Sequence, residues 1–254
     1  MGIAEEKAAL RTRYRQERNA RYIEHSFEFL ATTREFAAAS VIASYRSYGD
    51  EPSTSALNQK LISLGKTLLL PRIDGTSLQW VIWNGDETTL AMKKKIEEPV
   101  GNPIVDVSSI DLIVVPALRI DRSGYRLGQG GGFYDRALKD ISAFSIGLIH
   151  PDEISSEDLP RENWDIPLDA AATPDLVLRF TVELWKVARD NNSLNLIGSL
   201  VNLRQLGIAH HPLDWIIRYI SITTKNLNSI SSYLHRNIGG ISLTCCREEF
   251  KVFI

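Results

Sequence analysis

Residues 126–136 read Arg126-Leu127-Gly128-Gln129-Gly130-Gly131-Gly132-Phe133-Tyr134-Asp135-Arg136, with four glycines in five positions. Residues 111–118 precede this stretch as a β-rich apolar run with the length of a buried strand. Residues 133–141 follow it with helical character. The glycines therefore lie between a strand and a helix, where their backbone can adopt positive φ and approach a ligand closely.

This arrangement suits a phosphate group. The first turn of a helix presents free N–H groups and a partial positive charge, and Arg126 and Arg136 bracket the loop with side chains that can hold phosphate oxygens. Two common phosphate patterns do not fit, because no Gly-Lys-Ser/Thr follows and Phe133 stands where a dinucleotide loop needs glycine. A tight strand-to-helix turn without a ligand remains the alternative.

The composition is that of a soluble globular protein, with 44% hydrophobic and 24% charged residues. A net charge of −2 gives no indication of nucleic acid or an anionic membrane as a partner, and no apolar run is long enough to span a bilayer. The N-terminus lacks an apolar signal core, and the adjacent Cys245 and Cys246 form neither a disulfide framework nor a metal pattern. We therefore expect a cytoplasmic protein.

Hydrophobic patterning predicts strands that alternate with helices, which is typical of an α/β sheet covered by helices. The expected helices are 4–22, 26–38, one with Pro52 in its first turn, and 133–141. The first of these is amphipathic, with Ala8, Leu10, Tyr14 and Tyr22 among arginines. The expected strands are 41–45, 67–73, 78–83, 112–118, 144–149 and 171–178. After about Val187 the composition changes, and residues 188–254 carry seven Lys/Arg against four Asp/Glu. This extension holds one candidate helix at 208–222 and no motif.

The order Arg-Leu-Gly-x-Gly-x-Gly-Phe-Tyr-Asp-Arg closely resembles the signature of the 5-formyltetrahydrofolate cyclo-ligase family, and the resemblance runs from about Glu5 to about Leu178. It implies a three-layer α/β/α fold, shared with ribose-phosphate isomerase and glucosamine-phosphate deaminase, for a domain of residues 1–187. It also implies a carbon–nitrogen ligase that uses ATP and Mg²⁺ to convert a reduced folate, and we expect a monomer with no nucleic-acid or membrane partner.

The resemblance also implies site residues. The residues implied to bind ATP are Lys7, Ala8, Ala9, Leu10, Arg11, Arg126, Leu127, Gly128, Gln129, Gly130, Gly131, Gly132, Phe133 and Tyr134. Those implied to bind the folate are Arg46, Glu51, Gln129, Gly130, Gly131, Gly132 and Phe133, and those implied to serve Mg²⁺ are Asp135 and Asp165. Lys7 and Arg11 are four residues apart and so share one face of a helix.

Several positions depart from the family pattern. The family usually continues Glu-Val-Asp-Thr, whereas this chain has Glu51-Pro52-Ser53-Thr54, and arginine is an unexpected residue type at position 46. Asn163 and Trp164 stand where a histidine usually precedes Asp165. Simpler roles remain open: a solvated surface for Lys7 and Arg11, acids at helix N-termini for Glu51 and Asp135, and a loop residue for Asp165. Two other functions also remain open, a sugar-phosphate isomerase and a non-catalytic folate- or nucleotide-binding relative.

Overall fold

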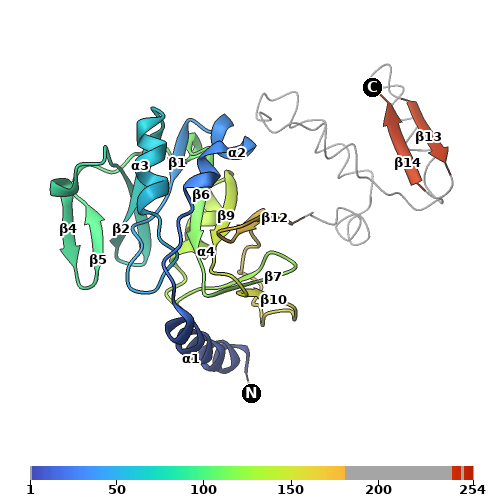
Figure 1. Cartoon of the computed structure of the whole chain (residues 1–254), viewed down its shortest axis with the longest axis horizontal. Helices are drawn as coiled ribbons and strands as arrows, with labels where there is room; N and C mark the ends of the chain where they lie inside the picture. Colours follow the sequence, from blue (N-terminus) through green and yellow to red (C-terminus); the bar gives the residue numbers. More distant parts are fainter. Residues whose placement is uncertain (1, 181–241, 247–248, 254) are drawn as a thin grey trace. The chain divides into compact units, whose positions relative to one another are not determined.

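The computed structural model describes residues 2–180, 242–246 and 249–253 (Figure 1). The chain forms two compact units, Met1–Thr181 and Val182–Ile254. In the second unit, β13 (Ser242–Cys246) pairs antiparallel with β14 (Glu249–Phe253). The expected helix at 208–222 and the expected boundary near Val187 lie outside the described residues.

A seven-stranded sheet forms the centre of the first unit, in the order β12-β11-β9-β6-β1-β2-β3. Its strands are β1 (Val41–Ala43), β2 (Thr67–Asp74), β3 (Ser77–Ile82), β6 (Leu112–Pro116), β9 (Phe144–Leu148), β11 (Ala170–Ala172) and β12 (Val177–Arg179). The five inner strands run parallel, and the two edge strands are antiparallel. The α/β sheet predicted from the sequence is thus confirmed, and the structure shows that it is mostly parallel.

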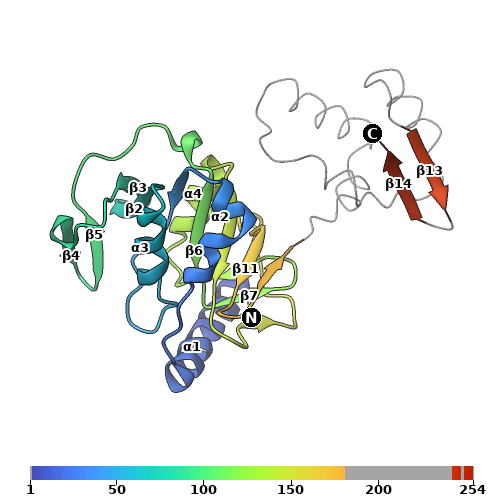
Figure 2. The same cartoon turned by 45° about the horizontal axis from the view of Figure 1, so that its top comes forward.

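Successive side chains of a strand point to opposite faces of the sheet, and a hydrophobic core lies on each face. In β6, for example, Leu112 and Val114 enter one core and Ile113 and Val115 the other. The first core is covered by η1 (Glu28–Thr32), α2 (Arg34–Ala38) and α3 (Ser55–Ser63). The second is covered by α4 (Phe133–Asp140) and a small sheet of β7 (Arg119–Asp121), β8 (Arg126–Leu127) and β10 (Ile154–Ser155). Figure 2 shows these layers from a second angle.

The remaining elements flank this body. The hairpin β4 (Leu90–Lys93) and β5 (Ile96–Pro99) extends from one side, and η2 (Glu87–Thr89) and η3 (Val107–Ser109) are single 3₁₀ turns (Figure 1). Among the described residues, no helix has both the length and the apolar character needed to cross a bilayer.

Three sequence predictions were wrong in detail, each because of local backbone chemistry. The helix expected over 26–38 is interrupted at Thr33, whose backbone is extended and whose hydroxyl donates to the Leu30 carbonyl. The strand expected over 171–178 is two antiparallel strands, closed by a bond from the Thr173 N–H to the Leu176 carbonyl across Pro174. The helix expected to include Pro52 begins only at Ser55.

Helix α1 (Ile3–Arg21) has the expected span but not the expected buried face. Ala8 and Tyr22 are exposed, whereas the buried residues are Lys7 and Arg18. Arg18 donates to the Ala117 carbonyl just after β6, so α1 docks at the carboxyl ends of the parallel strands. Figure 1 shows it beneath the sheet in dark blue. This helix is held by paired charges, which explains why an apolar pattern did not identify its inner side.

Candidate active site

The loop of residues 128–132 connects β8 to α4 and needs glycine at several points. Gly130 and Gly132 have φ of 104° and 65°, which side chains disfavour. A Cβ at Gly131 would lie 2.7 Å from the ring of Phe133. The sequence placed this loop between a strand and a helix, and the structure confirms that position, with the β7–β8 hairpin inserted after the central strand β6.

Four of the five loop carbonyls accept hydrogen bonds, whereas the N–H groups of the loop have no acceptor among the described residues. Within the described part of the chain, the backbone N–H groups of residues 129–132 donate no hydrogen bond. Arginines instead bind three carbonyls: Arg11 Nε lies 2.9 Å from Gly128 O, Arg15 Nη2 3.0 Å from Gln129 O and Arg136 Nη2 2.8 Å from Gly131 O. Since C=O and N–H point in opposite directions across a trans peptide, the N–H groups of Gln129, Gly130 and Gly132 each point away from the carbonyl that an arginine holds in the same peptide. Such a row of free N–H groups can bind an anion.

The basic side of α1 lies beside this loop. Lys7 is buried, with its Nζ 2.5 Å from Asp165 and 3.1 Å from Glu162. Arg11 lies against Gly130, 3.4 Å from where a Cβ would be, and burial and then the charge of Arg15 lower its pKa. The structure therefore brings Arg11 to the glycine loop from more than a hundred positions away in sequence, whereas Lys7 pairs with Glu162 and Asp165. Between them, Ala8 and Ala9 are exposed and Leu10 is half-buried.

Arg126 and Arg136 do not face an open loop as the sequence suggested. The buried guanidinium of Arg126 donates to Asp135 at 2.6 Å and to the Ile166 carbonyl at 2.9 Å, and burial lowers its pKa. Arg136 donates to Thr76 O and to Gly131 O, so it contacts the carbonyl side of the loop.

The two predicted metal residues lie in one charged cluster with these cations. Asp135 pairs with Arg126, and Asp165 pairs with Lys7 while accepting the N–H of Glu162 at 2.8 Å. The charges of both aspartates act on Arg11 and on Arg126, so both carboxylates influence the same two cations. In residues 2–180, no three acidic, histidine or cysteine side chains are grouped so as to hold a metal. In this structure both carboxylates are ion-paired with cations, Asp135 with Arg126 and Asp165 with Lys7.

Glu51 lies in the loop that follows β1. Its carboxylate is buried and accepts the Tyr48 N–H at 3.3 Å, and burial raises its pKa to about 7. Burial, and then the nearby Glu51, raise the pKa of the half-buried Tyr134 in the first turn of α4. The charge of Glu51 thus acts on the first turn of α4, although the two are some eighty positions apart in sequence.

Arg46 follows the carboxyl end of β1 and is ion-paired with two glutamates. Its guanidinium contacts Glu97 at 2.6 Å and Glu87 at 2.9 Å, and it lies over the Trp83 ring with its central carbon 5.4 Å from the ring centroid. It ties β5 and η2 to β1. A folate contact by Arg46 stays a prediction.

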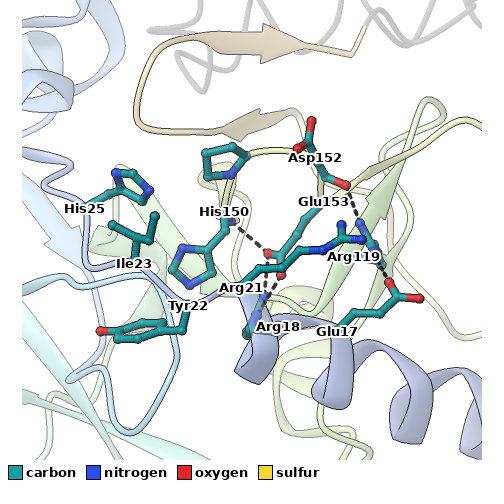
Figure 3. Close-up of a pocket in the computed structure, with 11 residues that line it drawn as sticks. Glu17, Arg18, Arg21, Tyr22, Ile23, His25, Arg119, His150, Asp152 and Glu153 are labelled. Carbon is teal, nitrogen blue, oxygen red and sulfur yellow. Dashed lines mark hydrogen bonds and ion pairs between the residues drawn. The ribbon is translucent and has the colours of Figure 1, made fainter.

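The sequence reasoning missed a polar core behind α1. Arg18 and Glu153 form a buried ion pair of 2.7 Å, and Glu153 also accepts the His150 N–H at 2.8 Å (Figure 3). The ring of His150 bonds to Asp50 O at 2.9 Å, and burial lowers its pKa. The repeated spacing of Lys7, Arg11, Arg15 and Arg18 on one helical face was the available signal.

Two hollows border this polar core rather than the glycine loop. One, of about 200 Å³, is the hollow of Figure 3 and includes Arg21, His25 and Arg119 in its wall. The other, of about 460 Å³, is open and includes Asn19, Tyr22, Gly49 and Asp50. Neither wall contains a residue of the loop. We locate the site by its free donors and cations, because a phosphate needs these more than an enclosed volume.

A mostly parallel α/β sheet with a glycine loop of free N–H groups beside a basic helix face is typical of phosphate-binding α/β proteins. The sequence model of the 5-formyltetrahydrofolate cyclo-ligase family matches residues 3–174, and the chain belongs to this family. It is 33% identical over 147 residues to the 5-formyltetrahydrofolate cyclo-ligase of Escherichia coli (strain K12), covering 55% of this chain and 80% of that protein.

Two further comparisons agree. The chain is 36% identical over 143 residues to the 5-formyltetrahydrofolate cyclo-ligase of Mycolicibacterium smegmatis, covering 52% of this chain and 73% of that protein. The NMR structure of Aquifex aeolicus 5,10-methenyltetrahydrofolate synthetase superposes with a TM-score of 0.59 at 29% identity, covering 68% of this chain and 92% of that structure. The family resemblance drawn from the glycine stretch is confirmed.

Proposed function

We propose that this chain converts 5-formyltetrahydrofolate and ATP into 5,10-methenyltetrahydrofolate, ADP and phosphate. The family supports the reaction, and one observation carries the assignment of the site: the free N–H groups of residues 129–132 lie in a loop that Arg11 contacts, with Lys7 one turn away on the same helix face. These donors and cations come from distant parts of the chain, and both kinds of group bind phosphate oxygens. Together they would form a site for a polyphosphate.

The chemistry explains why such a site suffices. The formyl oxygen attacks the γ-phosphorus of ATP and ADP leaves, which turns a poor leaving group into a phosphate ester. Folate N10 then attacks the formyl carbon, loses its proton, and phosphate departs with the oxygen. Such a transfer needs positioning and charge neutralisation rather than a covalent nucleophile. The loop N–H groups, Lys7, Arg11 and Arg126 supply these in our proposal.

The carboxylates of Asp135 and Asp165 would hold Mg²⁺, since hard oxygen ligands together with substrate phosphates are what this ion prefers. When bound, the ion would neutralise charge on the phosphates. The two aspartates bind Arg126 and Lys7. An ion held by these carboxylates would compete with the two ion pairs, which would leave Lys7 and Arg126 available to the phosphates.

Glu51 is the proposed pterin contact, because an ionised carboxylate accepts from the amino and ring N–H groups of a pterin. The charge of Glu51 acts on Tyr134, which supports a folate placed between the loop after β1 and the glycine segment. Arg46 and residues 129–133 remain predicted folate contacts. A cytoplasmic monomer without a nucleic-acid partner likewise remains our prediction.

Release of ADP from ATP in the presence and absence of 5-formyltetrahydrofolate tests the proposal. We expect ADP only when both ligands are present. A sugar-phosphate isomerase would instead interconvert sugar phosphates without ATP, and a non-catalytic relative would bind ATP or folate without releasing ADP. Either result would reject the proposed reaction.

A further inference from the structure

We propose that Arg15 is a positioning residue that holds the glycine loop from its carbonyl side and so orients the loop N–H groups toward phosphate. The inference rests on the proposed function, since the loop it holds is the proposed ATP site. Arg15 donates twice to one residue: its Nε lies 2.8 Å from Gln129 Oε1, and its Nη2 lies 3.0 Å from Gln129 O.

The geometry of one peptide unit carries the argument. The Gln129 carbonyl and the Gly130 N–H belong to the same planar group, so holding the carbonyl against Arg15 turns that N–H to the opposite side. Gly130 has φ of 104° and no side chain, and an unheld peptide at such a residue can rotate easily. The planar guanidinium of Arg15 donates to the side-chain and main-chain oxygens of Gln129 at once, which restricts rotation of the peptide between Gln129 and Gly130.

Arg15 has no evident competing role. It is exposed on α1, and among the described residues it has no carboxylate partner. The neighbouring cations on the same helix face differ, because Lys7 and Arg18 are buried and ion-paired. Loss of Arg15 should therefore change the order of the loop and not the stability of the fold.

Steady-state kinetics with each substrate varied, together with thermal melting, test this assignment. We expect Arg15→Ala to raise the KM for ATP about 3- to 10-fold, as loss of two hydrogen bonds to neutral groups would. The Tm should stay unchanged, and the KM for 5-formyltetrahydrofolate should rise less than the KM for ATP, because residues 129–133 are also predicted folate contacts. Arg15→Lys should recover only part of the loss, because an ammonium keeps the charge without the planar fork.

Two variants serve as controls. Arg13→Ala removes an exposed arginine from the same helix that pairs with Glu17 and does not contact the loop, so its KM for ATP should equal that of the wild type. Arg11→Ala removes a proposed phosphate contact and should raise the KM for ATP. Gln129→Ala removes the side-chain bond from Arg15 but keeps the bond to the main-chain carbonyl, so in a double-mutant cycle it should add little to Arg15→Ala.

The possible outcomes separate the two proposals. If Arg11→Ala raises the KM for ATP while Arg15→Ala leaves it unchanged, the role of Arg15 is rejected and the ATP site stands. If Arg15→Ala lowers the Tm and raises both KM values alike, Arg15 is a structural residue and the proposal is also rejected. If neither variant changes ATP use, the assignment of the ATP site itself fails.

Discussion

Arg126 shows how one side chain joins several parts of the site. It lies at the mouth of the glycine loop in sequence, but its guanidinium is buried against Asp135 and the Ile166 carbonyl. It can therefore contribute to phosphate binding by its charge and by the placement of Asp135. The two proposed ligand types, cation and metal carboxylate, are coupled through this pair.

We expect Arg126→Ala to weaken ATP use more than folate binding. Removing one charge-assisted contact costs roughly 1.5–3 kcal/mol, or on the order of 10- to 150-fold in the KM for ATP. Kinetics with each substrate varied would measure both effects. Arg122→Ala is the matched control, because Arg122 is exposed in the same hairpin and has no partner among the described residues. Equal ATP constants for Arg126→Ala and wild type would exclude the assignment.

Glu51→Gln should weaken folate binding and leave ATP binding nearly intact. The amide would present a donor toward the pterin N–H groups, where the carboxylate presents only acceptors. An unflipped mismatch in a buried pocket costs on the order of 1–3 kcal/mol, or about 5- to 150-fold in affinity. Calorimetric titration with 5-formyltetrahydrofolate would measure it. Unchanged affinity would mean that Glu51 is only an acid near the start of a helix.

The same residue should make stability depend on pH. Burial raises the pKa of Glu51 from 4.5 to about 7, so between these values the folded chain keeps a proton that the unfolded chain has released. Stability therefore falls as pH rises through this window, by on the order of 3 kcal/mol. Glu51→Gln cannot lose that proton and should be more stable than wild type at pH 8 but not at pH 4.

Urea denaturation at the two pH values would test this expectation. Glu157→Gln is a suitable control, since Glu157 is exposed and its substitution should leave the free energy of unfolding unchanged at both pH values. A constant difference in unfolding free energy between Glu51→Gln and wild type at both pH values would show that Glu51 titrates normally.

Among the elements, α1 has the most unusual attachment. It docks through charged side chains, and the Arg18–Glu153 pair has side chains only 1% and 8% exposed. Removing one partner of a buried pair leaves the other charge uncompensated, which typically costs 3–5 kcal/mol. The helix therefore depends on pairing rather than on apolar burial.

We accordingly expect Arg18→Ala to lower the free energy of unfolding by about 3–5 kcal/mol. Arg13→Ala, on the exposed side of the same helix, should change it by less than about 0.5 kcal/mol. Chemical denaturation of both variants would compare them under one condition. A loss below about 1 kcal/mol for Arg18→Ala would show that α1 is held by other contacts.

The elements that the sequence predicted well are those with one dominant pattern. The strands at 67–73, 78–83 and 144–149 were expected from apolar residues and turn signals, and β2, β3 and β9 match them closely. The glycine loop and the cations at positions 7 and 11 were expected from their motif, and the structure brings Arg11 into contact with the loop.

Other features depended on tertiary contacts that a pattern cannot show. The buried side of α1 is polar, so its partners Glu153, Glu162 and Asp165 become visible only when the chain is folded. The engagement of Arg46 by Glu87 and Glu97 likewise requires the placement of the β4–β5 hairpin. Hydrophobic periodicity carries no information about such pairings.

At the scale of the whole molecule, the residues matched by the family, 3–174, lie within the first unit. Both hydrophobic cores of the described residues also belong to that unit. We expect a chain that ends after Val187 to keep a cooperative melting transition and its ADP-releasing activity. Calorimetry of the truncated and full chains would measure this. Loss of the cooperative transition would mean that the extension is part of the folded body.

The most direct test of the account follows the absorbance of 5,10-methenyltetrahydrofolate and the release of ADP in one reaction. The account predicts one ADP for each methenyl product, no product without ATP, and no ADP without 5-formyltetrahydrofolate. Methenyl product formed without ATP, or ADP released without the folate, would contradict a reaction driven by phosphorylation of the formyl oxygen at the glycine loop.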